Sequence, residues 1–105
     1  MKDALKLPET AEERSVEAAA FGEGSADPGR CSDMAMEAMS RVAGAGFAMR
    51  SLSLEVASHR LGAGEVSIRA HADKRTQSIV FVSAEAWQGE QLVFSAQGLF
   101  SRRET

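Results

Sequence analysis

The sequence predicts an α+β fold in which one helix is followed by an antiparallel β-sheet of four to five strands. Three observations lead to this prediction. A single apolar period of 3.6 residues ends at Gly44, and the period changes to 2 after Gly46. Four strand-like runs then follow one another with short breaks between residues 47 and 103. One helix followed by a strand meander is the pattern of an α+β domain.

Length and composition indicate a single small domain. The chain has 105 residues, at the small end of what buries a self-sufficient core. Its 44% hydrophobic and 26% charged residues are ordinary for a globular protein, and no apolar run approaches the roughly 20 residues that span a bilayer. Residues 1–9 lack the apolar core of a secretory signal. We therefore expect a soluble, cytoplasmic protein without a membrane partner.

Several function classes are excluded by what the sequence lacks. It has no basic stripe and no tyrosine, which argues against a nucleic-acid partner. The single cysteine, Cys31, cannot form an internal disulfide, and we expect it to be a small buried thiol. The two histidines, His59 and His71, are expected at the surface, and with Cys31 they lack the close spacing of a zinc site. No metal and no cofactor is expected.

Residues 1–30 form the least determined part of the chain. Residues 8–21 fit a short amphipathic helix, but residues 16–21 fit an edge strand equally well. Residues 22–30 concentrate glycine, serine, aspartate and proline and therefore predict a loop. We treat residues 1–30 as an N-terminal segment and residues 31–105 as the main domain.

The predicted helix begins after an N-cap at Ser32 or Asp33 and ends before Gly44. Its apolar residues follow the helical period and share one face, with Met36 widening the stripe. The residues of this face are Met34, Ala35, Ala38, Met39, Val42 and Ala43. A stripe this wide predicts a helix that is surrounded by the sheet.

The strand-like runs differ in how they are expected to be covered. Residues 47–57 and 65–72 alternate between apolar and polar side chains, so each of these strands has one solvated face. Residues 78–87 and 91–100 begin as continuous apolar runs, which is typical of central strands covered on both sides. Residues 88–90 read as a hairpin connection. The last three strands are therefore expected to form an antiparallel meander.

A sheet with a single helix leaves an edge or a face without a partner. Exposed edges are usually paired or blunted, so we expect the chain to dimerise. The strand that carries Leu52, Leu54 and Val56 is the candidate to pair with its symmetry mate in a closed two-fold assembly.

Residues 32–100 carry a resemblance to a known family. The matching features are an acidic residue early in the helix and four segments of strand pattern. These segments are residues 53–56 (Ser-Leu-Glu-Val), 64–66 (Gly-Glu-Val), 75–85 and 92–100. Together they resemble the hotdog-fold acyl-CoA thioesterases of the 4-hydroxybenzoyl-CoA and phenylacetate-pathway type. The resemblance implies a hotdog fold, in which a central helix is wrapped by a curved antiparallel sheet.

The resemblance also implies a site on the helix. Asp33 occupies the position of the family's helix carboxylate, which resembles a general base or nucleophile acting on a thioester. Glu37 is a competing carboxylate, since residues four apart on a helix share a face. Each has an ordinary structural alternative, because aspartate at a helix start is commonly a cap and glutamate in the first turns is commonly solvated against the helix dipole.

The stretch before the helix departs from the family pattern. Where the family usually has a His-Gly-Gly turn, residues 26–31 read Ala-Asp-Pro-Gly-Arg-Cys. Either Gly29 and Arg30 supply an altered turn for substrate binding, or the chain is a shortened relative without catalysis. The phosphates of an acyl-CoA would meet cations, for which the candidates are Arg60, Lys74, Arg75, Arg102 and Arg103.

Two functions follow from the resemblance as hypotheses. The first is a thioesterase that hydrolyses a small or medium acyl-CoA, with Asp33 or Glu37 activating water at a dimer interface. The second is a non-catalytic hotdog protein that binds an acyl-CoA or a protein partner. In both cases we expect a homodimer or a dimer of dimers.

Overall fold

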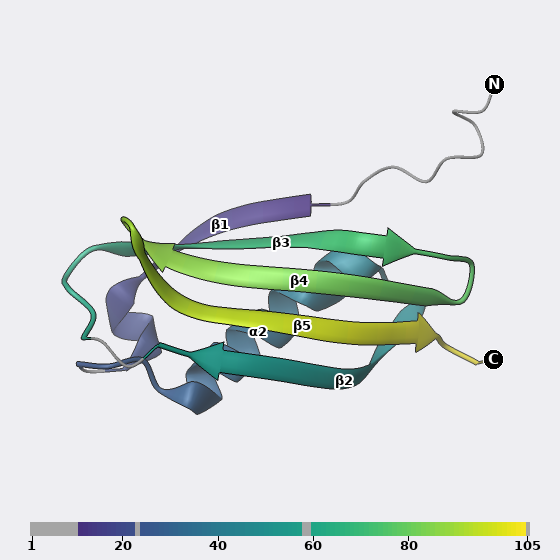
Figure 1. Ribbon diagram of the computed structural model, residues 1–105, viewed down its shortest axis with the longest axis horizontal. Helices are drawn as coiled ribbons and strands as arrows, with labels where there is room; N and C mark the ends of the chain where they lie inside the picture. Colours follow the sequence, from purple (N-terminus) through teal and green to yellow (C-terminus); the bar gives the residue numbers. More distant parts are fainter. Residues whose placement is uncertain (1–10, 23, 58–59, 105) are drawn as a thin grey trace, which may run out of the picture.

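The computed structural model describes residues 11–22, 24–57 and 60–104, so the predictions for residues 1–10 and for His59 lie outside the described residues. One helix crosses one face of a five-stranded antiparallel sheet (Figure 1), which confirms the predicted α+β class. The elements are β1 (Ala11–Glu17), the 3₁₀ helix η1 (Ala18–Phe21), α2 (Pro28–Ala43), β2 (Phe47–Val56), β3 (Glu65–Arg75), β4 (Ile79–Gln88) and β5 (Gln91–Arg102). No helix in the described ranges is long and apolar enough to cross a membrane.

The predicted meander is present. Strands β3, β4 and β5 are antiparallel neighbours within the sheet order β1-β3-β4-β5-β2. Gln88 pairs with Gln91, and Gly89 between them has a φ of 62°, as a two-residue hairpin turn with glycine in first place requires. The predicted hairpin at residues 88–90 is therefore confirmed.

The two outer strands of the sheet come from segments far apart in the sequence. Strand β2 does not pair with the next strand, β3, but with β5, in a register that runs from Phe47 opposite Arg102 to Val56 opposite Phe94. Strand β1 pairs with β3 at the opposite edge. The edge-strand alternative for the N-terminal segment is therefore right, but its range is wrong, because the strand ends at Glu17 and residues 18–21 form η1.

Helix α2 begins five or six residues earlier than the sequence predicted. Its N-cap is Asp27, whose Oδ2 accepts a hydrogen bond from the backbone N–H of Arg30 at 3.0 Å, and Pro28 stands in the first turn. The N-cap prediction of Ser32 or Asp33 is wrong, and residues 28–30 are helical instead of loop. Proline fits the first helical position because its φ is already helical and its missing N–H would be unpaired there.

The core lies between α2 and the face of the sheet that the helix covers. The helix buries Cys31, Ala35, Ala38, Met39, Val42 and Ala43 against β-strand side chains that include Val80, Val82, Phe94 and Phe100. The sequence predicted that Met36 widens this buried stripe, but 36% of its surface is exposed.

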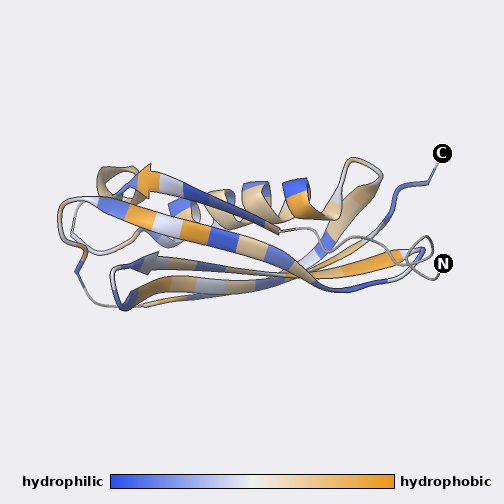
Figure 2. Ribbon diagram, turned by 90° about the horizontal axis from the view of Figure 1, so that it is seen from above, coloured by the Kyte–Doolittle hydropathy of each residue, from blue (hydrophilic) through white to orange (hydrophobic). Residues whose placement is uncertain are grey.

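The opposite face of the sheet has no covering element in the described chain. Figure 2 shows the helix on one side of the sheet only. Strands β4 and β5 are interior strands, as expected, but they are not covered on both sides. Phe81 of β4 is 43% exposed, whereas its neighbours Val80 and Val82 are buried. Strand β4 therefore has a continuous apolar run although only one of its two faces is buried in the described chain.

Candidate functional site

The two candidate carboxylates lie on the side of α2 that faces away from the sheet. Ala35 is fully buried, and positions 33 and 37 each lie about 200° from it around a helix that advances about 100° per residue. Both residues are accordingly exposed. Asp33 is six positions beyond the N-cap, so it is not the capping residue.

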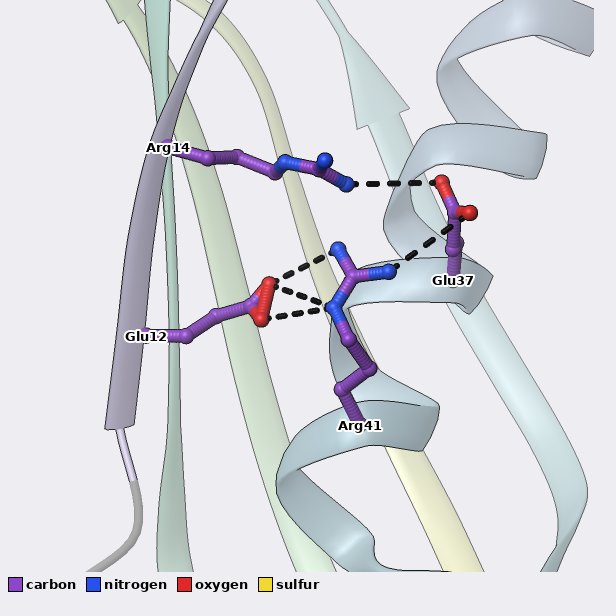
Figure 3. Close-up of polar contacts among 4 residues, drawn as sticks. All are labelled: Glu12, Arg14, Glu37 and Arg41. Carbon is purple, nitrogen blue, oxygen red and sulfur yellow. Dashed lines mark hydrogen bonds and ion pairs between the residues drawn. The ribbon is translucent and has the colours of Figure 1, made fainter.

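Glu37 is engaged in ion pairs with two arginines. Its Oε1 lies 3.6 Å from Nη1 of Arg14 on β1, and its Oε2 lies 3.5 Å from Nη1 of Arg41 on the next turn of α2 (Figure 3). Asp33 has no ion pair with any residue in the described ranges. Of the two carboxylates, Asp33 is therefore the one without an ion-pair partner among the described residues.

Arg41 also connects the helix to strand β1. Its Nε lies 2.8 Å and 3.0 Å from the two carboxylate oxygens of Glu12, and its Nη2 lies 2.8 Å from Oε2. These hydrogen bonds lower the pKa of Glu12 and raise the pKa of Arg41. Arg41 is thus held at one flank of the helix, the flank nearest the β1 edge.

The other flank of the helix faces the β2 edge. Helical spacing places Gly29 and Met36 on this flank, opposite to the position of Arg41, and places Asp33 beside them. Gly29 and Asp33 are four residues apart, so they are neighbours along the helix surface. The exposed Met36 extends this surface by a further turn.

The first turn of the helix contains the two residues that were expected to form an altered glycine turn. Gly29 and Arg30 are helical, and Arg30 Nη1 donates to the carbonyl oxygen of Ala20 at 3.3 Å. The backbone N–H of Arg30 is taken up by Asp27, and the backbone N–H of Cys31 donates to the Asp27 carbonyl at 3.0 Å. Pro28 has no N–H, so Gly29 is the first-turn residue whose N–H has no acceptor in the described part of the chain.

One cavity lies beside this end of the helix and does not contain the carboxylates. It has a volume of about 470 Å³ and is lined by residues from η1, the glycines before the helix and the segment before β3, among them Ala18, Gly22, Gly24, Leu61 and Gly64. Neither Asp33 nor Glu37 lines this cavity or the two hollows of about 390 Å³ and 340 Å³ on the uncovered face of the sheet.

The structure separates the predicted cationic residues into two groups. Arg60 lies at the end of the sheet where α2 begins, and it is exposed and bridged to Ser25. Lys74, Arg75, Arg102 and Arg103 lie at the opposite end, where α2 stops. A single phosphate group cannot contact both sets.

Three cations of the second group contact backbone carbonyl groups. Arg75 donates to the carbonyls of Val42 and Ala43 at the end of the helix. Arg102 donates to the carbonyl of Gln77, and Arg103 donates to that of Ala45 at 2.9 Å. Arg75 and Arg102 also stack over the ring of Phe47, at 5.7 Å and 5.3 Å from its centroid. Lys74 is exposed and has no ion pair with the described residues.

Sequence reasoning missed the arginines that hold Glu37. The spacing of Glu37 and Arg41, four residues apart on a helix, was the available signal. Arg14 and Glu12 gave none, because their approach to the helix depends on β1 pairing with β3. No group of three His, Cys, Asp or Glu side chains in the described part of the chain is placed to hold a metal ion.

Solved structures of other proteins share this arrangement of helix and sheet. A phenylacetic acid degradation-related protein from Ralstonia eutropha superposes with a TM-score of 0.73 at 22% identity, over 87% of this chain and 75% of that one. The PaaI protein of the Escherichia coli phenylacetic acid degradation operon superposes with a TM-score of 0.73 at 14% identity, over 91% and 73%. The chain has the hotdog fold.

A third hotdog structure was solved with a ligand. A hypothetical thioesterase from Streptococcus pneumoniae in complex with coenzyme A superposes with a TM-score of 0.70 at 11% identity, over 92% of this chain and 80% of that one. No protein-family model and no curated protein matches the sequence. At these low identities the likeness is one of fold, and it confirms the hotdog architecture that the sequence resemblance implied.

Proposed function

We propose that this hotdog protein hydrolyses the thioester bond of a small or medium acyl-CoA, with Asp33 as the general base. Two kinds of observation support the proposal. Several structures with the same fold are named thioesterases, and one of them was solved with coenzyme A. Fold likeness alone does not assign a reaction, so the proposal depends on the chemistry of the helix.

The observation that carries the proposal is the difference between Asp33 and Glu37. Arg14 and Arg41 bind the Glu37 carboxylate, whereas Asp33 is exposed and has no ion pair among the described residues. A general base must reach water and the substrate with its lone pairs free. Asp33 meets this requirement, and Gly29 lies one helical turn before it on the same flank.

The proposed reaction uses these two groups. Asp33 accepts a proton from water as the water oxygen attacks the thioester carbonyl carbon. The oxyanion of the tetrahedral intermediate accepts a hydrogen bond from the N–H of Gly29, at the positive end of the helix dipole. The carbon–sulfur bond then breaks, and the coenzyme A thiolate leaves and takes up the proton.

The proposed active form is a two-fold dimer paired through β2. This strand is a sheet edge in the described chain, and antiparallel pairing with its symmetry mate would continue the sheet across the axis. The partner's surface would then lie beside the helix flank that carries Gly29, Asp33 and Met36. Arg60, an exposed cation at the end of the sheet where α2 begins, is proposed to contact a phosphate of the substrate. Two such dimers could assemble further.

A non-catalytic hotdog dimer that binds acyl-CoA is the second candidate. It is favoured by residues 26–31, which lack the family's His-Gly-Gly turn, and by the absence of Asp33 from the three cavities described above. The two candidates predict different results in one assay, because only a hydrolase releases a thiol.

The test is the release of free thiol from a panel of acyl-CoA substrates. Asp33→Asn is expected to lower the rate by a factor of about 100 or more, the usual contribution of a general base. Glu90→Gln removes a comparable exposed carboxylate in the turn between β4 and β5, outside both α2 and the β2 edge, and serves as the matched control. Equal rates for wild type and Asp33→Asn would exclude Asp33 as the base. Binding of coenzyme A by wild type without thiol release from any substrate would instead establish the non-catalytic protein.

A further inference from the structure

We propose that Arg14 and Arg41 form a binding site for a phosphate group, and that the carboxylate of Glu37 is an exchangeable occupant of this site. The site lies between strand β1 and the last turns of α2 (Figure 3). It uses neither Asp33 nor Gly29, so it can bind a ligand whether or not the protein is a hydrolase.

The guanidinium group of Arg41 is held in a fixed orientation. Glu12 receives hydrogen bonds from Nε and Nη2 of Arg41 at 2.8 Å to 3.0 Å, which fixes the plane of the guanidinium group. The remaining nitrogen, Nη1, points to the same place as Nη1 of Arg14 (Figure 3). Fixing a long side chain in advance reduces the entropy cost of binding, and a guanidinium group matches the geometry of a phosphate.

The carboxylate of Glu37 is bound only loosely between Arg14 and Arg41. Glu37 lies 3.6 Å from Arg14 and 3.5 Å from Arg41, and both distances exceed the 2.7–3.2 Å of an N–H···O hydrogen bond. The Glu37 side chain is 63% exposed, so it can turn into solvent without disturbing the packing of the core. A tetrahedral phosphate has more acceptor oxygens and more charge than a carboxylate, and charge-assisted bonds to both arginines are available to it.

The charge balance of the cluster makes Glu37 a competitor. With Glu37 in place, the two carboxylates of Glu12 and Glu37 neutralise the two arginines. With Glu37 turned away, one positive charge remains for a ligand. A phosphate must therefore displace Glu37, and removing the charge of Glu37 should tighten phosphate binding.

Titration calorimetry with pyrophosphate at low ionic strength tests the site directly and requires no turnover. Glu37→Gln is expected to tighten pyrophosphate binding at least threefold, and Arg14→Gln to weaken it at least threefold. Glu13→Gln and Arg69→Gln are the matched controls, because this pair joins β1 to β3 at 3.6 Å with both side chains 61% exposed. The controls should leave the affinity unchanged.

Two outcomes would contradict the proposed phosphate site. One is an unchanged affinity in both Glu37→Gln and Arg14→Gln. The other is an equal change in Glu37→Gln and Glu13→Gln, which would report net charge alone. The circular dichroism spectrum of each variant shows whether weaker binding comes from loss of the site or from loss of the folded structure.

Coenzyme A and pantetheine, titrated into wild type and Glu37→Gln, identify the source of the phosphate. If Glu37→Gln tightens coenzyme A and leaves pantetheine unchanged, the site receives the nucleotide end of an acyl-CoA. If it tightens pyrophosphate and leaves coenzyme A unchanged, the site receives a separate phosphorylated ligand. Failure of thiol release in the activity assay affects neither result.

Discussion

Arg75, the last residue of β3, donates a hydrogen bond from Nη2 to the carbonyl oxygen of Val42 at 2.9 Å. Its Nη1 donates to the carbonyl oxygen of Ala43 at 3.2 Å. The last carbonyl groups of a helix have no partner within the helix and carry the negative end of its dipole. A side chain of the sheet therefore caps the C-terminal end of α2 and fixes the helix against the sheet.

Replacement of Arg75 should loosen this end of the helix. Arg75→Gln is expected to lower the free energy of unfolding by about 1–3 kcal/mol, the usual effect of losing hydrogen bonds to a charged donor. Urea denaturation followed by circular dichroism measures the change. The adjacent Lys74→Gln, which removes an exposed cation, should have little effect. Equal destabilisation by the two substitutions would show that the cap contributes nothing specific.

The ion pair of Glu12 and Arg41 should make stability depend on pH. The pKa of Glu12 is below its ordinary value in the folded protein because Arg41 donates hydrogen bonds to it. Its contribution is therefore complete above the pKa of the unfolded state and is lost as the pH falls through the lower folded pKa. Arg41→Gln should cost up to about 1 kcal/mol at neutral pH and less at acidic pH.

Urea titrations of wild type and Arg41→Gln at pH 7 and at pH 3 measure this difference. Arg69→Gln is a suitable control, since its ion pair with Glu13 is longer, at 3.6 Å, and more exposed. If wild type and Arg41→Gln differ by the same amount at both pH values, the pair does not stabilise through the charge of Glu12.

Gly98 of β5 leaves room for Met39 of the helix. A Cβ at this position would lie 3.2 Å from Sδ of Met39 and 3.2 Å from Cε1 of Phe100. Gly98→Ala should therefore destabilise the fold by about 1–3 kcal/mol through overpacking. Gly46→Ala is the control, because a Cβ there would meet nothing within 4 Å. Equal thermal midpoints for Gly98→Ala and wild type would show that Met39 adapts without cost.

Cys31 should be unreactive in the folded protein. Its thiol is fully buried, and burial, with a smaller effect from the negative charge of Asp27, raises its pKa to about 11. Little thiolate is then present at pH 8, although free cysteine reacts readily there. Alkylation at pH 8 should be slow in buffer and fast in urea. Ser40→Cys, at an exposed position of the same helix, provides a reactive control thiol. Fast alkylation of native Cys31 would contradict its burial.

The helix illustrates how local and tertiary signals differ. The glycine stop at Gly44 and the apolar face were predictable, because both depend on residues within one or two turns. The start was misplaced because Ser32 and Asp33 are also good capping residues, and a sequence does not show which candidate oxygen turns back to the backbone. In the structure Asp27 is the capping residue and Pro28 follows it. The backbone N–H of Asp27 donates to the carbonyl oxygen of Phe21 at 2.7 Å.

The candidate site was predictable only in part. Asp33 and Glu37 were identified by resemblance, and their shared helix face follows from spacing. One of the two ion pairs that distinguish Glu37 from Asp33 comes from Arg14, a residue of β1 that reaches Glu37 only because β1 joins the far edge of the sheet. Arg75 and Arg102 were candidate phosphate ligands in the sequence, which did not show that they donate hydrogen bonds to backbone carbonyls in the tertiary structure.

The sequence by itself determined one helix, its apolar face, the meander of β3, β4 and β5 and the turn at Gly89, since each of these depends on residues that are close along the chain. Only the tertiary structure decided that β2 pairs with β5, that β1 completes the sheet and that Arg14 and Arg41 bind Glu37. The physical reason is that strand partners and ion pairs between elements depend on which surfaces meet, and local periodicity carries no information about that choice.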